Sequence, residues 1–394
     1  MTFMADSERI TVLFVNPSTG LSGDTLSLGN LIESLRDEIE PIVLLTEKKS
    51  PAFEYFNSLG VECLVHPYLL LLEPQFRDKI KNVIPRFWRF RFVKWLRFEL
   101  PCMFYLQKAL TNRQVDIIHS NRSQVMMGYN LANKLKVPHV WHVREFPVYG
   151  DRKIYLGLPH LKKQINNSAA RIVISNPCMQ SWGLTEKNTW IINDAVRSVK
   201  ESCYEKEKQP YILFLSNMIY KAKGIEMAIE AFGKSGLFST FISGNTIRMK
   251  IVGNCTEDYK KKLLVFAEKY GCAEFIDFVP AQKNVKPYFA QAMAFVNPSV
   301  NEGMGRTTAE AMFFGCPVIA HASGGTLDLI KDGETGYLFK TVDELSELMK
   351  RVCTTDQEEV ILRAQEFAKN NLSIEDYGEK IMEVYKTVLK KNNY

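Results

Sequence analysis

The chain has 394 residues, of which 46% are hydrophobic and 24% are charged, and its formal net charge is +6. These proportions are typical of a folded globular protein and exclude a disordered or fibrous chain. At about 100 to 200 residues per domain, the length predicts two domains.

The start of the chain carries Asp6, Glu8 and Arg9 ahead of a short apolar run. At about six residues, that run is too short for a signal peptide or a membrane span, so we expect a cytoplasmic protein. Eight cysteines are scattered without a Cys-x-x-Cys pair. We therefore expect reduced cysteines and neither a zinc site nor a disulfide framework. The sequence has neither an Asp-x-Asp signature nor a His/Cys cluster with metal-ligand spacing, so we expect no metal, and we expect no cofactor.

Short apolar runs rich in β-branched residues alternate with helical patterns along most of the chain. This alternation predicts an α/β protein whose parallel sheets are covered by helices on both faces. A polar stretch at 197–210 interrupts the pattern, and a new strand follows it, which indicates a domain boundary. The predicted strands are 9–16, 41–46, 61–66, 115–120, 139–143 and 171–175 before the boundary, and 211–216, 248–252, 274–279, 294–297 and 317–320 after it.

Segment 76–100 concentrates positive charge and aromatic residues, with eight lysines or arginines between Arg77 and Arg97 against Asp78. Basic and aromatic side chains together favour docking on an anionic membrane surface, here the inner face of the cell membrane. A helix with a charged face and an aromatic core face explains the pattern equally well. Nucleic-acid binding by base stacking ranks third.

The stretch 297–320 carries the most informative motif. A predicted strand ends at Asn297, a loop carries Glu302 and two glycines, and a helix is predicted from Arg306 to Phe314. The free N–H groups of its first turn suit a diphosphate. Glu310, about one turn inside the helix, can accept hydrogen bonds from ribose hydroxyls, and Glu302 from sugar hydroxyls. Each glutamate could instead be a solvated surface charge.

This stretch strongly resembles the Glu-x7-Glu signature of retaining glycosyltransferases of family 4, which have the GT-B fold of two Rossmann-like doubly wound domains facing a central cleft. The resemblance continues through 317–320, 324–325 and 332–339. It implies that Glu302 contacts the donor sugar and Glu310 the donor ribose. It also implies that the intervening backbone faces sugar and phosphate, through Gly303, Met304, Gly305, Arg306 and Thr307.

A second similarity lies at the strand-to-helix turn after the predicted strand 211–216. Lys223 in this turn is in register with the Lys-Gly of the family, which implies that it places a cation on the diphosphate. The family commonly has an arginine six residues earlier, and this chain has Asn217 there. The second cation would then come from Lys221 or Arg306. A solvated surface lysine is the alternative.

Two residues of the first half complete the predicted site. Gly23 follows the first strand and resembles one of the paired glycines with which the family approaches the donor phosphates. His142 ends the fifth predicted strand and resembles a family histidine near the transferred sugar. A structural histidine beside Trp141 is the alternative, and His119 competes by position.

We expect residues 1–198 to form the acceptor-side domain and 199–373 the nucleotide-sugar domain, with a final helix at about 374–394 packing back on the first. The implied activity transfers a sugar from a UDP-sugar or GDP-sugar to a hydroxyl of a saccharide or lipid-linked saccharide, in polysaccharide or lipopolysaccharide synthesis. The expected catalytic residues are Glu302, His142 and Lys223. A nucleotide-sugar epimerase and a non-catalytic sugar-nucleotide-binding protein are the alternatives.

Overall fold

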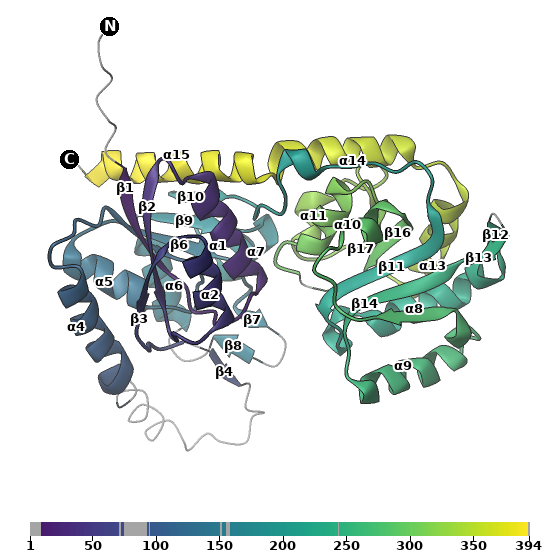
Figure 1. The fold of residues 1–394 in the computed structure, drawn as a ribbon, viewed down its shortest axis with the longest axis horizontal. Helices are drawn as coiled ribbons and strands as arrows, with labels where there is room; N and C mark the ends of the chain where they lie inside the picture. Colours follow the sequence, from purple (N-terminus) through teal and green to yellow (C-terminus); the bar gives the residue numbers. More distant parts are fainter. Residues whose placement is uncertain are drawn as a thin grey trace, which may run out of the picture. The chain divides into compact units, whose positions relative to one another are not determined.

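The computed structural model describes residues 9–70, 72–74, 93, 95–149, 152–154, 158–242, 244–300 and 302–392. The chain divides into two compact units, and the first combines Met1–Ala195 with Tyr377–Tyr394. The second unit is Val196–Asp376. Each unit contains a parallel sheet with helices around it (Figure 1).

The first unit is built on a seven-stranded sheet of order β10-β9-β6-β5-β1-β2-β3, in which every pairing is parallel. Its central strands are almost wholly buried because helices cover both faces. The strands are β1 (Ile10–Val15), β2 (Ile39–Leu45), β3 (Glu62–Val65), β5 (Ile117–Ser120), β6 (His139–Val143), β9 (Ala170–Val173) and β10 (Thr189–Ile191). The helices are α1 (Gly23–Ser34), α2 (Pro51–Ser58), α4 (Leu100–Ala109), α5 (Met127–Leu135), α6 (Leu158–Asn167) and α7 (Asn176–Trp182).

The last helix, α15 (Ile374–Asn392), runs along the first unit for most of its length (Figure 1). The Tyr385 hydroxyl lies 2.6 Å from His119 Nδ1 at the end of β5, and Arg144 Nη2 donates to the Tyr377 hydroxyl at 3.0 Å. A Cβ added to Gly378 would lie 2.5 Å from Ser34 Oγ, so α15 approaches α1 closely there. From Tyr377 onward, helix α15 thus contributes buried side chains to the core of the first unit.

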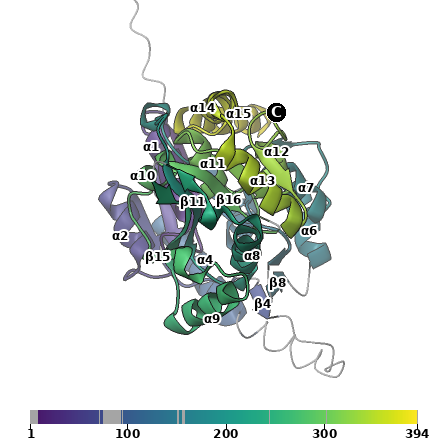
Figure 2. The ribbon, with the colours of Figure 1, turned by 90° about the vertical axis from the view of Figure 1, so that its right-hand side faces the viewer.

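The second unit is built on a six-stranded parallel sheet of order β15-β14-β11-β16-β17-β18. Helices α8 and α13 lie side by side (Figure 2) and share one apolar core. The strands are β11 (Gln209–Met218), β14 (Arg248–Asn254), β15 (Ile276–Val279), β16 (Ala292–Asn297), β17 (Val318–His321) and β18 (Tyr337–Phe339). The helices are α8 (Ile225–Ser235), α9 (Glu257–Glu268), α10 (Lys286–Ala290), α11 (Arg306–Phe313), α12 (Thr326–Leu329), α13 (Val342–Thr354) and α14 (Glu358–Asn371).

The predicted α/β class is confirmed, and every predicted strand is present within a few residues of its expected bounds. Sequence patterns missed the edge strands β10 and β18, each of three residues. They also missed two small antiparallel sheets, one of β4 (Leu72–Pro74), β8 (Arg152–Ile154) and β7 (Val148–Tyr149), the other of β12 (Phe241–Ile242) and β13 (Asn245–Thr246).

Most of the basic segment 76–100, namely 76–92 and 94, lies outside the described residues. Its described end forms a π-helical turn at Trp95–Glu99 that leads into α4. Among the helices of the ranges that the structure describes, none is both long and apolar enough to cross a membrane.

Candidate functional site

The loops after β11 and β16 bring Lys223 and Glu302 together. These strands are neighbours in a parallel sheet, so the loops at their carboxyl ends share one edge, where such sheets bind ligands. Lys223 ends the 3₁₀ turn Lys221–Lys223 after β11, and Glu302 lies in the loop after β16. Lys223 Nζ is 2.7 Å from Glu302 Oε1, with both side chains about three quarters buried. The predicted cation and the predicted sugar-binding carboxylate are therefore direct neighbours.

A glycine makes the approach of these two loops possible. Gly224 follows Lys223 with φ of 74°, and a Cβ there would lie 2.5 Å from the Pro298 carbonyl oxygen. Both the left-handed backbone and the contact disfavour any other residue. Gly224 also starts α8, so the position of Lys223 is tied to a buried helix.

The loop from Glu302 to α11 is fixed by backbone contacts with the next turn. Gly325 N donates to Glu302 O at 2.7 Å, and a Cβ on Gly325 would lie 2.2 Å from Gly303 O. Gly305 then starts α11 with φ of 97° and no side-chain cap. Helix starts of this kind present backbone N–H groups to anions, and the expected diphosphate position at this helix start stays a prediction. Met304 is buried, whereas Gly303, Arg306 and Thr307 are half-buried.

Glu310 lies on α11, as expected, and pairs with a residue that sequence reasoning did not single out. Its Oε1 is 2.8 Å from Nη2 of Arg197, and the glutamate side chain is 13% exposed. Both glutamates of the motif are thus paired with cations in this structure, Glu302 with Lys223 and Glu310 with Arg197. Asn217 lies exposed near the end of β11.

His142 is wholly buried in the first unit. Its Nδ1 lies 3.3 Å from His119 Nε2 and 3.2 Å from Arg144 Nη2, and its Nε2 lies 3.8 Å from Asp194 Oδ1. Burial, together with the Arg144 cation and His119, holds the pKa of His142 well below its ordinary value, so the ring is neutral. These surroundings favour the structural alternative, and the predicted contact of His142 with the transferred sugar stays a prediction.

A buried ion pair organises the polar groups around His142. Arg144 Nη1 contacts Asp194 Oδ1, and Arg144 also donates to Asn121 Oδ1 and Ser27 Oγ at 3.1 Å each. A buried ion pair needs such additional hydrogen bonds to offset desolvation. Sequence reasoning missed Arg144 and Asp194, although Arg144 directly follows a buried strand, where ligand-binding residues of parallel sheets collect.

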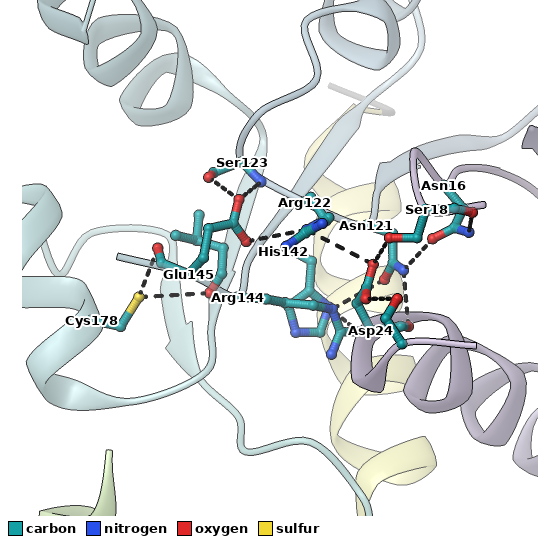
Figure 3. A network of polar contacts seen from close by, with 12 residues as sticks. Asn16, Ser18, Asp24, Asn121, Arg122, Ser123, His142, Arg144, Glu145 and Cys178 are labelled. Atoms are coloured by element: carbon teal, nitrogen blue, oxygen red, sulfur yellow. Dashed lines mark hydrogen bonds and ion pairs between the residues drawn. The ribbon is translucent and has the colours of Figure 1, made fainter. Parts of the chain in front are cut away.

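The polar network continues at the carboxyl ends of β1, β5 and β6, where Asn121 accepts from Arg144 and donates to the Asp24 carbonyl oxygen (Figure 3). Arg122, with a side chain 30% exposed, lies 3.8 Å from both Asp24 Oδ2 and Glu145 Oε2. Burial would raise the pKa of Asp24, but Arg122 and the hydroxyls of Ser18 and Ser22 outweigh burial and lower it. Gly23 is the first residue of α1, directly before Asp24. Of these three charged side chains, only that of Arg122 is partly exposed, whereas the carboxylates of Asp24 and Glu145 are buried, and no sequence motif pointed to this network.

The structure is similar to solved glycosyltransferases over nearly its whole length. It matches the Anabaena protein HepE in complex with UDP-glucose with a TM-score of 0.72, at 17% identity and covering 96% of this chain and 100% of that one. A glycosyltransferase from Rickettsia africae matches with a TM-score of 0.73, at 17% identity and covering 97% and 99%. The fold is therefore of the GT-B class.

Residues 198–372 match the family model described as glycosyl transferases group 1. An uncharacterized glycosyltransferase of Haemophilus influenzae is 31% identical over 144 residues, which are 36% of this chain and 39% of that protein. A trehalose synthase of Pyrococcus horikoshii is 25% identical over 252 residues, which are 61% and 58% of the two chains. The chain thus spans less than two thirds of the length of these curated relatives.

Proposed function

We propose that the protein is a retaining glycosyltransferase that moves a sugar from a nucleoside-diphosphate sugar to a hydroxyl of a saccharide or lipid-linked saccharide. The observation that carries the proposal is the edge of the second sheet, where Lys223, Glu302 and Glu310 lie on the loops and the helix that follow β11 and β16. All three residues fall within the part of the chain that matches the glycosyl transferases group 1 model.

The proposed roles follow from charge and hydrogen-bonding capacity. Glu310 accepts hydrogen bonds from the donor ribose, and Glu302 accepts from hydroxyls of the transferred sugar. Lys223 has three N–H donors, so it can keep one contact with Glu302 at 2.7 Å and direct another at the diphosphate. The start of α11 adds backbone N–H groups to the leaving group. Cationic and N–H groups in fixed positions stabilise the charge that develops as the sugar departs.

Similar solved structures support a UDP-sugar donor and a cell-surface acceptor. HepE was solved with UDP, with UDP and glucose, and with UDP-glucose. The lipopolysaccharide outer core galactosyltransferase WaaB matches with a TM-score of 0.70 at 15% identity, covering 96% of this chain and 99% of that one. We propose the same general chemistry here, with an oxygen of the donor diphosphate receiving the acceptor proton and the anomeric configuration retained.

A transfer assay tests this proposal. The protein is incubated with UDP-glucose, UDP-galactose, UDP-N-acetylglucosamine or GDP-mannose, with and without an oligosaccharide or lipid-linked acceptor. The expected product forms only with acceptor and has the anomeric configuration of the donor, read from the anomeric proton coupling by NMR. An inverted product would refute retention. An isomerised sugar nucleotide formed without acceptor would identify an epimerase instead.

A further inference from the structure

Glu310 is held by a basic residue that lies far away in the sequence. Nη2 of Arg197 lies 2.8 Å from Glu310 Oε1, with side chains 27% and 13% exposed, and both residues belong to the second unit. We propose that Arg197 is a positioning residue for donor binding, which orients the Glu310 carboxylate for the ribose hydroxyls. This inference rests on the proposed function and extends it to a residue outside the Glu-x7-Glu motif.

Arg197 lies at the start of the second unit in the sequence, and its backbone is held by residues near the end of that unit. Val196 N donates to Leu372 O at 3.1 Å, and Ile374 N donates to Arg197 O at 3.0 Å. Arg197 and Ser373 form a parallel bridge between these hydrogen bonds. The segment between α14 and α15 therefore holds Arg197 in place before any ligand arrives.

The side chain of Arg197 is fixed by the same helix that carries Glu310. Its Cζ lies 5.6 Å from the ring centroid of Phe314, which directly follows α11 and is buried. A guanidinium over an aromatic face gains electrostatic attraction, and its planar group keeps one orientation. Arg197 Nε lies 4.0 Å from Glu201 Oε2. The guanidinium thus has a defined place against α11.

A carboxylate held in this way remains able to bind a diol. Its two oxygens offer about four lone-pair sites, and the Arg197 contact uses one of them, on Oε1. Within the described ranges of the chain, no residue forms a hydrogen bond with Glu310 Oε2. Two vicinal ribose hydroxyls can therefore donate to Glu310 while the ion pair persists. Because the carboxylate is already ordered, less conformational entropy is lost when the nucleotide binds.

The test compares Arg197→Met with a matched control, Lys286→Met. Lys286 Nζ lies 5.9 Å from the same Phe314 ring and donates to Glu201 O at 3.2 Å. The affinities of UDP, GDP and ADP are measured by calorimetry, together with those of their 2′,3′-dideoxy analogues. For the ribonucleotide that binds the parent protein, Arg197→Met should raise Kd about tenfold and Lys286→Met less than about twofold. The dideoxy analogue should bind all three proteins alike.

A double-variant comparison separates positioning from general charge loss. In the Glu310→Ala background, Arg197→Met should weaken ribonucleotide binding no further, because its target is gone. An unchanged Kd in Arg197→Met, an equal loss with the dideoxy analogue, or a further tenfold loss in the Glu310→Ala background would each overturn the inference. If Arg197→Met does not fold, Arg197→Lys serves in its place, with an expected loss of about threefold. Failure of the parent protein to bind any of the three nucleotides would refute the proposed function itself.

Discussion

At the residue scale, the most specific expectation concerns the charge of Glu302. The Glu302→Gln variant keeps the shape of the side chain but loses the negative acceptor and its pairing with Lys223 at 2.7 Å. A hydrogen bond to a charged group contributes roughly 1.5 to 3 kcal/mol. We therefore expect kcat/KM to fall by about one to two decades while the melting temperature stays within a few degrees. Wild-type turnover in this variant would remove Glu302 from the mechanism.

Buried histidines predict a loss of stability in acid. Burial lowers the pKa of His139 to about 3, and Ser120 Oγ lies 2.9 Å from its Nε2. The unfolded chain binds the proton near pH 6.5, and the folded chain does not until about pH 3. The contribution of His139 is therefore complete above pH 6.5 and is lost as the pH falls, by about 1.4 kcal/mol per unit.

The His139→Gln variant isolates this contribution. All five tryptophans of the sequence precede residue 196, so urea unfolding followed by tryptophan fluorescence reports the first unit. Between pH 7 and pH 5, the parent protein should lose about 2 kcal/mol more unfolding free energy than the variant. Equal losses in the two proteins would show that His139 does not titrate as the structure implies.

At the element scale, the loop that carries Glu302 depends on a close contact with the turn at Gly325. A Cβ at Gly325 would lie 2.2 Å from Gly303 O and 2.6 Å from Met304 Cα. Because both contacts are with backbone, Gly325→Ala should displace the loop that carries Glu302, at a cost of about 1 to 3 kcal/mol. The free energy of unfolding measured by calorimetry should be lower than in the parent protein, and donor affinity should be reduced as well.

Gly20→Ala is the matched control for that variant, since a Cβ at Gly20 meets nothing within 4 Å. It should leave stability and donor affinity within error of the parent protein. If Gly325→Ala binds donor as tightly as Gly20→Ala does, then the packing of Gly325 against the loop does not shape the site.

The long elements could be predicted from the sequence because local patterns determine them. Strands such as β1 and β11 are apolar runs ending at turns, and their periodicity is visible without a partner. Strands β10 and β18 were not predicted, because a run of three residues carries too little pattern to identify a strand. Each of them forms only beside an existing sheet edge. Sequence can assign a strand of this length only with knowledge of its neighbour.

The residues of the candidate site also differ in whether the sequence alone could predict them. Glu302, Glu310 and Lys223 belong to compact motifs, so the sequence could indicate them together. Arg197 and Glu310 become neighbours only through tertiary structure, as do Arg144 and Asp194. The position of Arg144 after a buried strand marks that residue alone, and nothing local identifies Asp194 or Arg197 as the partner, so these pairs could not be predicted.

At the scale of the whole molecule, the basic segment 76–100 carries the prediction of membrane docking. Each lysine or arginine near an anionic surface contributes about 1 kcal/mol. The quadruple variant with Arg86, Arg89, Arg91 and Lys94 changed to glutamine should therefore float less with liposomes of phosphatidylglycerol, and the difference should shrink as salt rises. Nucleotide affinity should be unchanged. Equal flotation of variant and parent protein at every salt concentration would contradict membrane docking.

The central claim is that the second unit binds a nucleotide sugar through the Glu-x7-Glu motif, and calorimetric unfolding with UDP-, GDP- and ADP-sugars tests it most directly. One of these donors, at 100 times its Kd, should stabilise the parent protein by about 2.7 kcal/mol, or roughly 5 to 10 °C. At the same concentration, Glu310→Ala should show less than about half of that stabilisation, because it loses roughly one to two decades of affinity. No shift of the parent protein with any donor, or an equal shift in Glu310→Ala, would contradict the claim.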